Sequence, residues 1–129
     1  VTMMWNTSSA NTKSALWIIN NKRMYFYHLN NIPAKELFPG YHGKFVHTGT
    51  STVAFWNIDA DAPIPEHSHM HEQIMHVVEG EFELTVDGKT ERLTAGAVVT
   101  IPGHIKHGGK AISNCKVIDI FMPEREEYK

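Results

Sequence analysis

The sequence predicts an all-β domain, either a sandwich or a barrel, and three observations support this fold class. Short apolar runs follow one another closely from about residue 23, and Gly and Pro residues stand between them. The pair Asp87-Gly88 marks a hairpin, because these residue types readily take the positive φ angles of a type I′ turn. A parallel sheet would need crossover helices, and no segment of the sequence indicates them.

The elements are expected in a simple order along the chain. Residues 1–22 are polar and mixed and are expected to form an N-terminal arm, whereas residues 23–129 are expected to form the β domain. One helical turn is expected at Pro33–Leu37. The expected strands are Arg23–Leu29, Lys44–Thr48, Thr52–Ile58, Ile74–Val78, Glu81–Val86, Thr90–Leu93, Ala97–Ile101 and Lys116–Met122.

A chain of 129 residues fits one domain with a core of its own. Trp56, Phe55 and Phe82 are expected to fill this core, since small barrels need large apolar side chains inside. The lone Cys115 cannot form an intrachain disulfide, which is compatible with a reducing compartment. Its position before an apolar run predicts a buried, inert thiol.

Composition argues against two classes of partner. Twelve basic and fourteen acidic residues leave a net charge of -2, and no basic stripe is present, so nucleic acid is not expected to bind. No apolar run approaches the roughly 20 residues of a membrane span. The N-terminus lacks the basic start and long apolar stretch of a secretory signal, so a cytoplasmic location is expected.

The nine histidines of the chain include a pattern that predicts a metal site. His67 and His69 are two residues apart, and alternate side chains of an extended segment share a face about 6.6 Å apart. Gln73 follows, and His107 comes some thirty residues later, after a Gly and a Pro. Imidazole nitrogens suit zinc, iron, nickel and copper, and an amide oxygen can complete the coordination shell.

Other residues of this segment are alternative ligands. His71 would share the face of His67 and His69 if the strand continued. Glu72 could replace Gln73, but a shift of one residue would turn it to the opposite face, so Gln73 is favoured. His76 and His104 are expected at the rim or surface.

The favoured ligand set is electrically neutral, which has a chemical consequence. Three imidazoles and one amide leave the charge of the ion uncompensated, which favours Lewis-acid action on an anionic, oxygen-rich ligand over electron transfer. Calcium and magnesium prefer carboxylate oxygens and are not expected here.

These spacings resemble the two motifs of the cupin superfamily, G-x5-H-x-H-x3-4-E-x6-G and G-x5-P-x-G-x2-H-x3-N. The first corresponds to His67-Ser68-His69, three residues, Gln73, six residues and Gly80, and the second to Gly96, five residues, Pro102, four residues and His107. Four positions depart from the motifs: Asp61 and Ala111 replace the leading Gly and the final Asn, Gln73 replaces Glu, and His104 replaces Gly. The resemblance spans about residues 50–122 and implies a cupin-like double-stranded β-helix, a jelly-roll barrel.

The last predicted strand allows two interpretations. Val117, Asp119 and Phe121 lie on one face, and Ile118, Ile120 and Met122 lie on the other. In the first interpretation the Ile face points inward and Asp119 faces solvent. In the second, Asp119 and Phe121 lie beside the metal, and the Ile face packs in a dimer or under the N-terminal arm.

The Gln ligand, the Pro-x4-His motif and the ending Asp-x-Phe-x-Pro-x-Arg-Glu resemble the KdgF family of pectin-degradation cupins. The resemblance implies ring opening of 4,5-unsaturated monouronates, small-molecule sugar acids from pectin or alginate breakdown, to the linear keto sugar acid. It implies one divalent transition metal ion (Ni, Zn, Fe or Mn) on His67, His69, Gln73 and His107. Asp119 would then be catalytic, and Phe121 and Arg125 would bind substrate.

The resemblance leaves some alternatives open. Arg125 could instead form an ordinary surface ion pair with Glu124, Glu126 or Glu127, which contributes little. The chain could also be a metal-dependent dioxygenase acting on a small molecule, or a non-catalytic sugar-binding cupin, because fold alone does not choose among functions.

Aromatic residues in or near the N-terminal arm favour self-association. Trp5, Trp17 and Tyr25-Phe26-Tyr27 would be costly to expose to water, so the arm is expected to cross onto a partner subunit. A homodimer is therefore expected.

Overall fold

The computed structural model describes residues 24–129 and divides into two compact units, Val1–Asn31 and Ile32–Lys129. In the first unit, the described residues contain one short 3-10 helix, η1 (Leu29–Asn31), and Met24–His28 have no regular structure. The strand predicted at Arg23–Leu29 is therefore wrong over its described residues. The aromatic residues there favour strands, but Phe26 is 82% exposed, and these residues gain no burial from strand formation. The predictions for Trp5, Trp17 and residues 1–22 lie outside the described residues.

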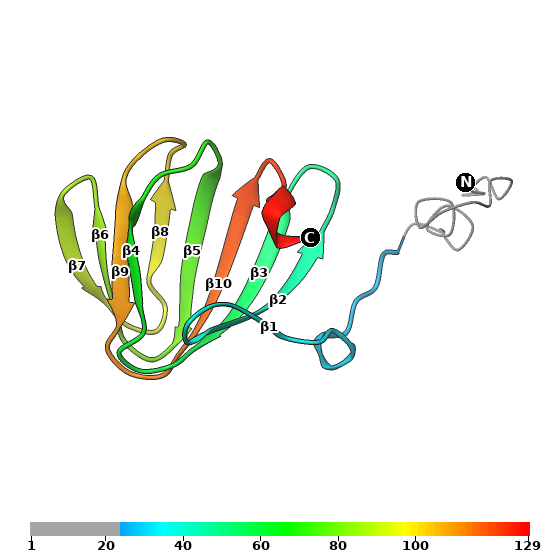
Figure 1. Ribbon diagram of the computed structural model, residues 1–129, viewed down its shortest axis with the longest axis horizontal. Helices are drawn as coiled ribbons and strands as arrows, with labels where there is room; N and C mark the ends of the chain where they lie inside the picture. The colour runs from blue at the N-terminus through cyan, green and yellow to red at the C-terminus, as the bar shows by residue number, and fades with distance from the viewer. Residues whose placement is uncertain (1–23) are drawn as a thin grey trace, which may run out of the picture. The chain divides into compact units, whose positions relative to one another are not determined.

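The second unit consists of two antiparallel sheets (Figure 1). The six-stranded sheet has the order β1-β2-β3-β10-β5-β8, and the four-stranded sheet has the order β4-β9-β6-β7. The strands are β1 (Lys35–Phe38), β2 (Tyr41–His47), β3 (Thr52–Ile58), β4 (Pro63–His67), β5 (Glu72–Glu79), β6 (Phe82–Val86), β7 (Lys89–Leu93), β8 (Val98–Ile101), β9 (His107–Ala111) and β10 (Cys115–Met122), and a 3-10 turn, η2 (Glu126–Tyr128), follows them. The predicted all-β jelly-roll fold is confirmed. Within residues 24–129, no helix is long and apolar enough to cross a membrane.

Seven predicted strands are confirmed to within a few residues: β2, β3, β5, β6, β7, β8 and β10. Three strands were not predicted. β1 forms where a helical turn was expected, because residues from Lys35 onward pair with β2. β4 contains two prolines, which its position at a sheet edge tolerates. β9 is rich in glycine and has little intrinsic strand preference.

The hydrophobic core lies between the two sheets, because buried residues of both sheets belong to one cluster. Trp56 and Phe82 are in this core as predicted, and the Cys115 thiol is also buried. Phe55 is not in the core, because it alternates with Trp56 and lies half-buried on the other face of β3. The hairpin turn predicted at Asp87-Gly88 is confirmed by their φ angles of 51° and 80°.

Neighbouring strands bring the predicted site residues to one inward face. In β10, Cys115, Val117, Asp119 and Phe121 are buried, and the alternate residues are more exposed. The inward orientation of Asp119 and Phe121 in the second interpretation is therefore confirmed, and the interpretation that placed Asp119 in solvent is wrong. The packing of the Ile face in a dimer or under the arm stays a prediction. Phe121 pairs with Gln73 of β5, and Asp119 pairs with Ala54 of β3.

Candidate metal centre

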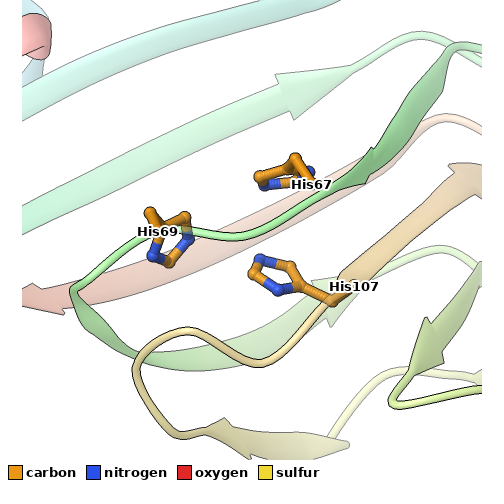
Figure 2. Close-up of side chains that lie close together, drawn as sticks. All are labelled: His67, His69 and His107. Carbon is orange, nitrogen blue, oxygen red and sulfur yellow. The ribbon is translucent and has the colours of Figure 1, made fainter.

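Three of the four predicted metal ligands form one cluster, from two strands and a loop. Ligand nitrogens of His67, His69 and His107 all lie within 4.8 Å of one another, and Figure 2 shows the three rings converging. His67 ends β4 and pairs directly with His107 at the start of β9, where the ring centroids are 4.4 Å apart. The His69 ring lies 4.9 Å from that of His107.

The backbone brings the histidines together in a way that differs from the predicted extended segment. β4 ends at His67, so His69 lies in the following loop and not on the same strand face. The backbone N–H of His104 donates to the His69 carbonyl at 2.7 Å and holds this loop. Gly108, next to His107, allows β4 to approach β9, because a Cβ atom there would lie 2.8 Å from the Glu66 nitrogen.

Hydrogen bonds to the backbone fix the tautomer of the His67 and His107 rings. His67 Nδ1 lies 2.8 Å from the Pro65 carbonyl oxygen, and His107 Nδ1 lies 2.8 Å from that of Ile105. His69 Nδ1 lies 3.1 Å from the carbonyl oxygen of residue 71. A carbonyl oxygen only accepts, so Nδ1 carries the hydrogen in the His67 and His107 rings and Nε2 keeps a free lone pair. The His69 ring takes the same tautomer when it donates to residue 71. His107 Nε2 is buried and has no hydrogen-bond partner among residues 24–129, which is expected of an atom that binds a metal.

Gln73 supplies a fourth donor atom to the same cluster. Its Nε2 donates to Asp119 Oδ1 at 3.0 Å, which directs its Oε1 toward His69 Nε2 at 3.1 Å. With the His69 hydrogen on Nδ1, two lone pairs face each other across this distance. A cation between them would remove the repulsion, so the residues present fit a divalent transition metal held by three nitrogens and one amide oxygen.

The alternative ligands lie elsewhere. His71 Nε2 lies 3.2 Å from the Glu124 carbonyl oxygen, and this ring is not part of the ligand cluster. Glu72 is exposed whereas Gln73 is buried, as the one-residue alternation of β5 requires. His104 is exposed. His76 is half-buried and lies on the same face of β5 as Ile74.

Burial keeps the His69 and His107 imidazoles neutral. It lowers the pKa of His69 to about 4, and the charge of Arg125 and the neighbouring His107 act in the same direction. Burial also lowers the pKa of His107. Both rings are therefore unprotonated near neutral pH, which is the form that binds metal.

Asp119 lies next to Gln73. Its Oδ1 accepts from Gln73, and its Oδ2 accepts from Trp56 Nε1 at 3.0 Å. Burial raises the pKa of this carboxyl group to about 6, against the two hydrogen bonds and the charge of Arg125, which lower it. The carboxylate is thus held rigidly, one side chain away from the centre of the histidine cluster.

A cavity of about 50 Å³ adjoins the histidine cluster. His67, Gln73 and His107 form its polar end. Its remaining lining is mostly apolar and aromatic and comes from Phe38, Tyr41, Trp56, Ile58, Ile64, Met75, Phe82, Leu84, Phe121, Arg125 and Tyr128. Asp119 does not line this cavity but is hydrogen-bonded to Gln73 and Trp56, which do, whereas Phe121 and Arg125 line it directly. The lining thus combines the polar groups of the histidine cluster and one arginine with apolar and aromatic side chains.

Arg125 is buried at the cavity wall and is not a surface residue. Its guanidinium carbon lies 4.7 Å from the Phe121 ring centroid and 4.3 Å from that of Tyr128. The expected alternative, an ion pair with a nearby glutamate, is present with Glu127. The pair involves a guanidinium that is only 10% exposed, so the description of an ordinary surface pair is wrong.

Sequence reasoning missed Tyr128. This residue is buried near the C-terminus and packs against Phe45, Trp56 and Phe121. Burial raises its pKa to about 12. The only signal in the sequence is one aromatic residue within a charged ending.

Comparisons with known proteins agree with this geometry. Residues 54–121, more than half of the chain, match the cupin domain family. No curated protein matches the sequence. The fold is similar to an RmlC-like cupin from Shewanella frigidimarina, with 29% identity, a TM-score of 0.79 and coverage of 82% of this chain and 96% of that one. It is similar to KdgF from a Halomonas species, with 30% identity, a TM-score of 0.78 and coverage of 82% and 99%. Ectoine synthase from P. lautus shares the fold at 21% identity, with a TM-score of 0.71 and coverage of 79% and 80%.

Proposed function

The chain belongs to the cupin domain family, and we propose that it is a metal-dependent enzyme that opens the ring of 4,5-unsaturated monouronates to the linear keto sugar acid. The observation that carries the proposal is the neutral centre of three histidine Nε2 atoms and one amide oxygen beside a buried carboxylate and a buried arginine. The similarity to KdgF over 82% of this chain supports it.

The reaction is an isomerisation and needs no co-reactant. The anomeric hydroxyl loses its proton, the bond between C1 and the ring oxygen breaks, and an aldehyde forms at C1. The ring oxygen becomes an enolate oxygen on C5, and protonation of C4 converts this enolate to the ketone. The reaction therefore balances within the substrate, provided that one protein group carries the proton from the anomeric oxygen to C4.

His67, His69, His107 and Gln73 would hold the divalent ion, which supplies Lewis acidity toward an oxygen-rich anion when bound. Asp119 is the carboxylate that takes the hydroxyl proton and returns it to C4. Trp56 and Gln73 hold this carboxylate in place through their N–H groups.

Two residues of the cavity wall bind the substrate in this proposal. Arg125 pairs with the uronate carboxylate, for which its planar guanidinium is well suited. Phe121 presents an apolar surface to the sugar ring and keeps water from that side.

The test is incubation of the metal-loaded protein with an unsaturated monouronate, followed by the loss of the enol-ether absorbance. We expect turnover in the wild type and none in Asp119→Asn, whose metal content should be unchanged. The exposed His104→Ala is the matched control and should keep both activity and metal. His107→Ala should lose both. Oxygen uptake with a phenolic substrate, without any reaction of the uronate, would contradict the proposal in favour of a dioxygenase.

A further inference from the structure

The C-terminal turn carries a carboxylate that holds Arg125 by one edge. Glu127 Oε2 accepts hydrogen bonds from Arg125 Nε at 3.1 Å and from Arg125 Nη2 at 2.9 Å. The rings of Phe121 and Tyr128 lie against the same guanidinium. The Glu127 carboxylate therefore holds one edge of the guanidinium, and the two aromatic rings pack against it. Together these contacts define both the position and the rotation of the group.

This arrangement leaves part of the guanidinium unused. A guanidinium has five N–H donors, and Glu127 accepts from two of them. The described residues form no side-chain hydrogen bond with the others. These donors belong to Nη1 and Nη2, which make the second edge of the planar group. Because Arg125 lines the cavity and Glu127 does not, this second edge is the one available to a ligand there.

The two partners differ in their exposure to water. The Arg125 side chain is 10% exposed, and that of Glu127 is 54% exposed. The hydrogen bond from Arg125 is the main reason why the pKa of Glu127 is lowered, so this carboxyl group is charged near neutral pH. A solvated anion thus steadies a buried cation without entering the cavity.

We propose that Glu127 is a positioning residue for Arg125, and that it turns the two-nitrogen edge of the guanidinium toward the cavity to bind one carboxylate through two hydrogen bonds. The substrate part of this inference rests on the proposed function, since a monouronate carries one such carboxylate. The site should then prefer a monocarboxylate sugar over a neutral sugar of the same size.

The expected effect of losing Glu127 is on substrate binding. Without its partner, the guanidinium rotates about its long side chain and meets the carboxylate in fewer productive orientations. We expect Glu127→Gln to raise KM about fivefold and to leave kcat within about twofold, since Glu127 touches neither the metal ligands nor Asp119.

The matched control is Glu126→Gln, which removes a carboxylate from the same turn. The Glu126 carboxylate is paired with Lys129 at 3.1 Å, and among the described residues it forms no hydrogen bond or ion pair with its chain neighbour Arg125. This variant should keep the wild-type KM. In the Arg125→Lys background, adding Glu127→Gln should change KM no further, because Glu127 acts only through the arginine. An equal rise of KM in both backgrounds, or an unchanged KM in Glu127→Gln, would overturn the inference.

A second measurement does not depend on turnover. The Nε–H signal of Arg125 in ¹⁵N–¹H NMR spectra, assigned by its loss in Arg125→Lys, should be protected from solvent exchange in the wild type and in Glu126→Gln. It should broaden in Glu127→Gln, and a saturated monouronate should shift it in the wild type, whereas the matching neutral sugar should not. Protection and this shift without any turnover would refute the proposed reaction and support the role of Glu127. An Nε–H signal equally exposed in all these proteins would refute that role.

Discussion

Replacing Trp56 by Phe removes one of the two hydrogen bonds that hold the buried Asp119. The indole N–H donates to Asp119 Oδ2 at 3.0 Å, and Trp56 is 5% exposed. Phe keeps most of the apolar contact but has no donor. The carboxylate then keeps only the bond from Gln73. The effect on stability should therefore depend on whether Asp119 is charged.

The magnitude follows from the pKa of Asp119. Its rise from 3.8 to about 6 on folding corresponds to about 3 kcal/mol of cost for burying the charged form. Because the folded pKa lies above the unfolded value, the native state binds more protons between these values, and stability falls as pH rises through that window. A hydrogen bond to a charged group contributes about 2 kcal/mol, and one to a neutral group about 1 kcal/mol. Trp56→Phe should therefore cost about 1 kcal/mol more when Asp119 is charged.

The assay is urea unfolding of metal-free wild type and Trp56→Phe at about pH 8 and about pH 4.5. The histidines titrate alike in both proteins, and the loss of indole volume costs the same at both pH values. The difference between the two losses of unfolding free energy therefore reports only the hydrogen bond to Asp119. The matched control is Tyr41→Phe, which removes the bond from the Tyr41 hydroxyl to the Ala62 carbonyl at 3.2 Å and should cost the same at both pH values. An equal loss for Trp56→Phe at both pH values would refute the reasoning.

Three further predictions concern the metal centre and the outer sheet face. In metal-free protein the pKa of His69 is 6.5 in the unfolded chain and about 4 in the folded one. The unfolded chain therefore binds more protons below pH 6.5, and the free energy of unfolding falls as the pH drops. The variant His69→Gln should flatten this slope in urea titrations. Gly108→Ala places a Cβ atom 2.8 Å from the Glu66 nitrogen and separates β4 from β9, and competition with a chelator should show metal affinity lowered by about tenfold. We propose that the outer face of β10 packs in a homodimer, so light scattering should give a dimer for the wild type and a monomer for Ile120→Lys; a monomeric wild type would contradict this.

Local patterns in the sequence were sufficient for the all-β class, most strands and the hairpin turn, because alternation and turn residues act over a few positions. They also predicted the residues that meet in the candidate metal centre, since His67, His69 and Gln73 are close in the chain. The mechanism by which they meet was not predicted correctly, because β4 stops at His67 and a loop held by the His104 N–H carries His69.

Other features required the tertiary structure. Alternation along β10 permitted either face to point inward, and only the donors of Trp56 and Gln73 on neighbouring strands make a buried Asp119 acceptable. The charged C-terminal ending resembles a solvated surface, and its short-range pattern holds no information on what it packs against. The sequence by itself determined which residues have the chemistry of a metal site, because side-chain chemistry and local spacing are written in the chain. The tertiary structure alone determined that Arg125 and Tyr128 lie at the cavity wall, because their burial depends on contacts with strands distant in sequence.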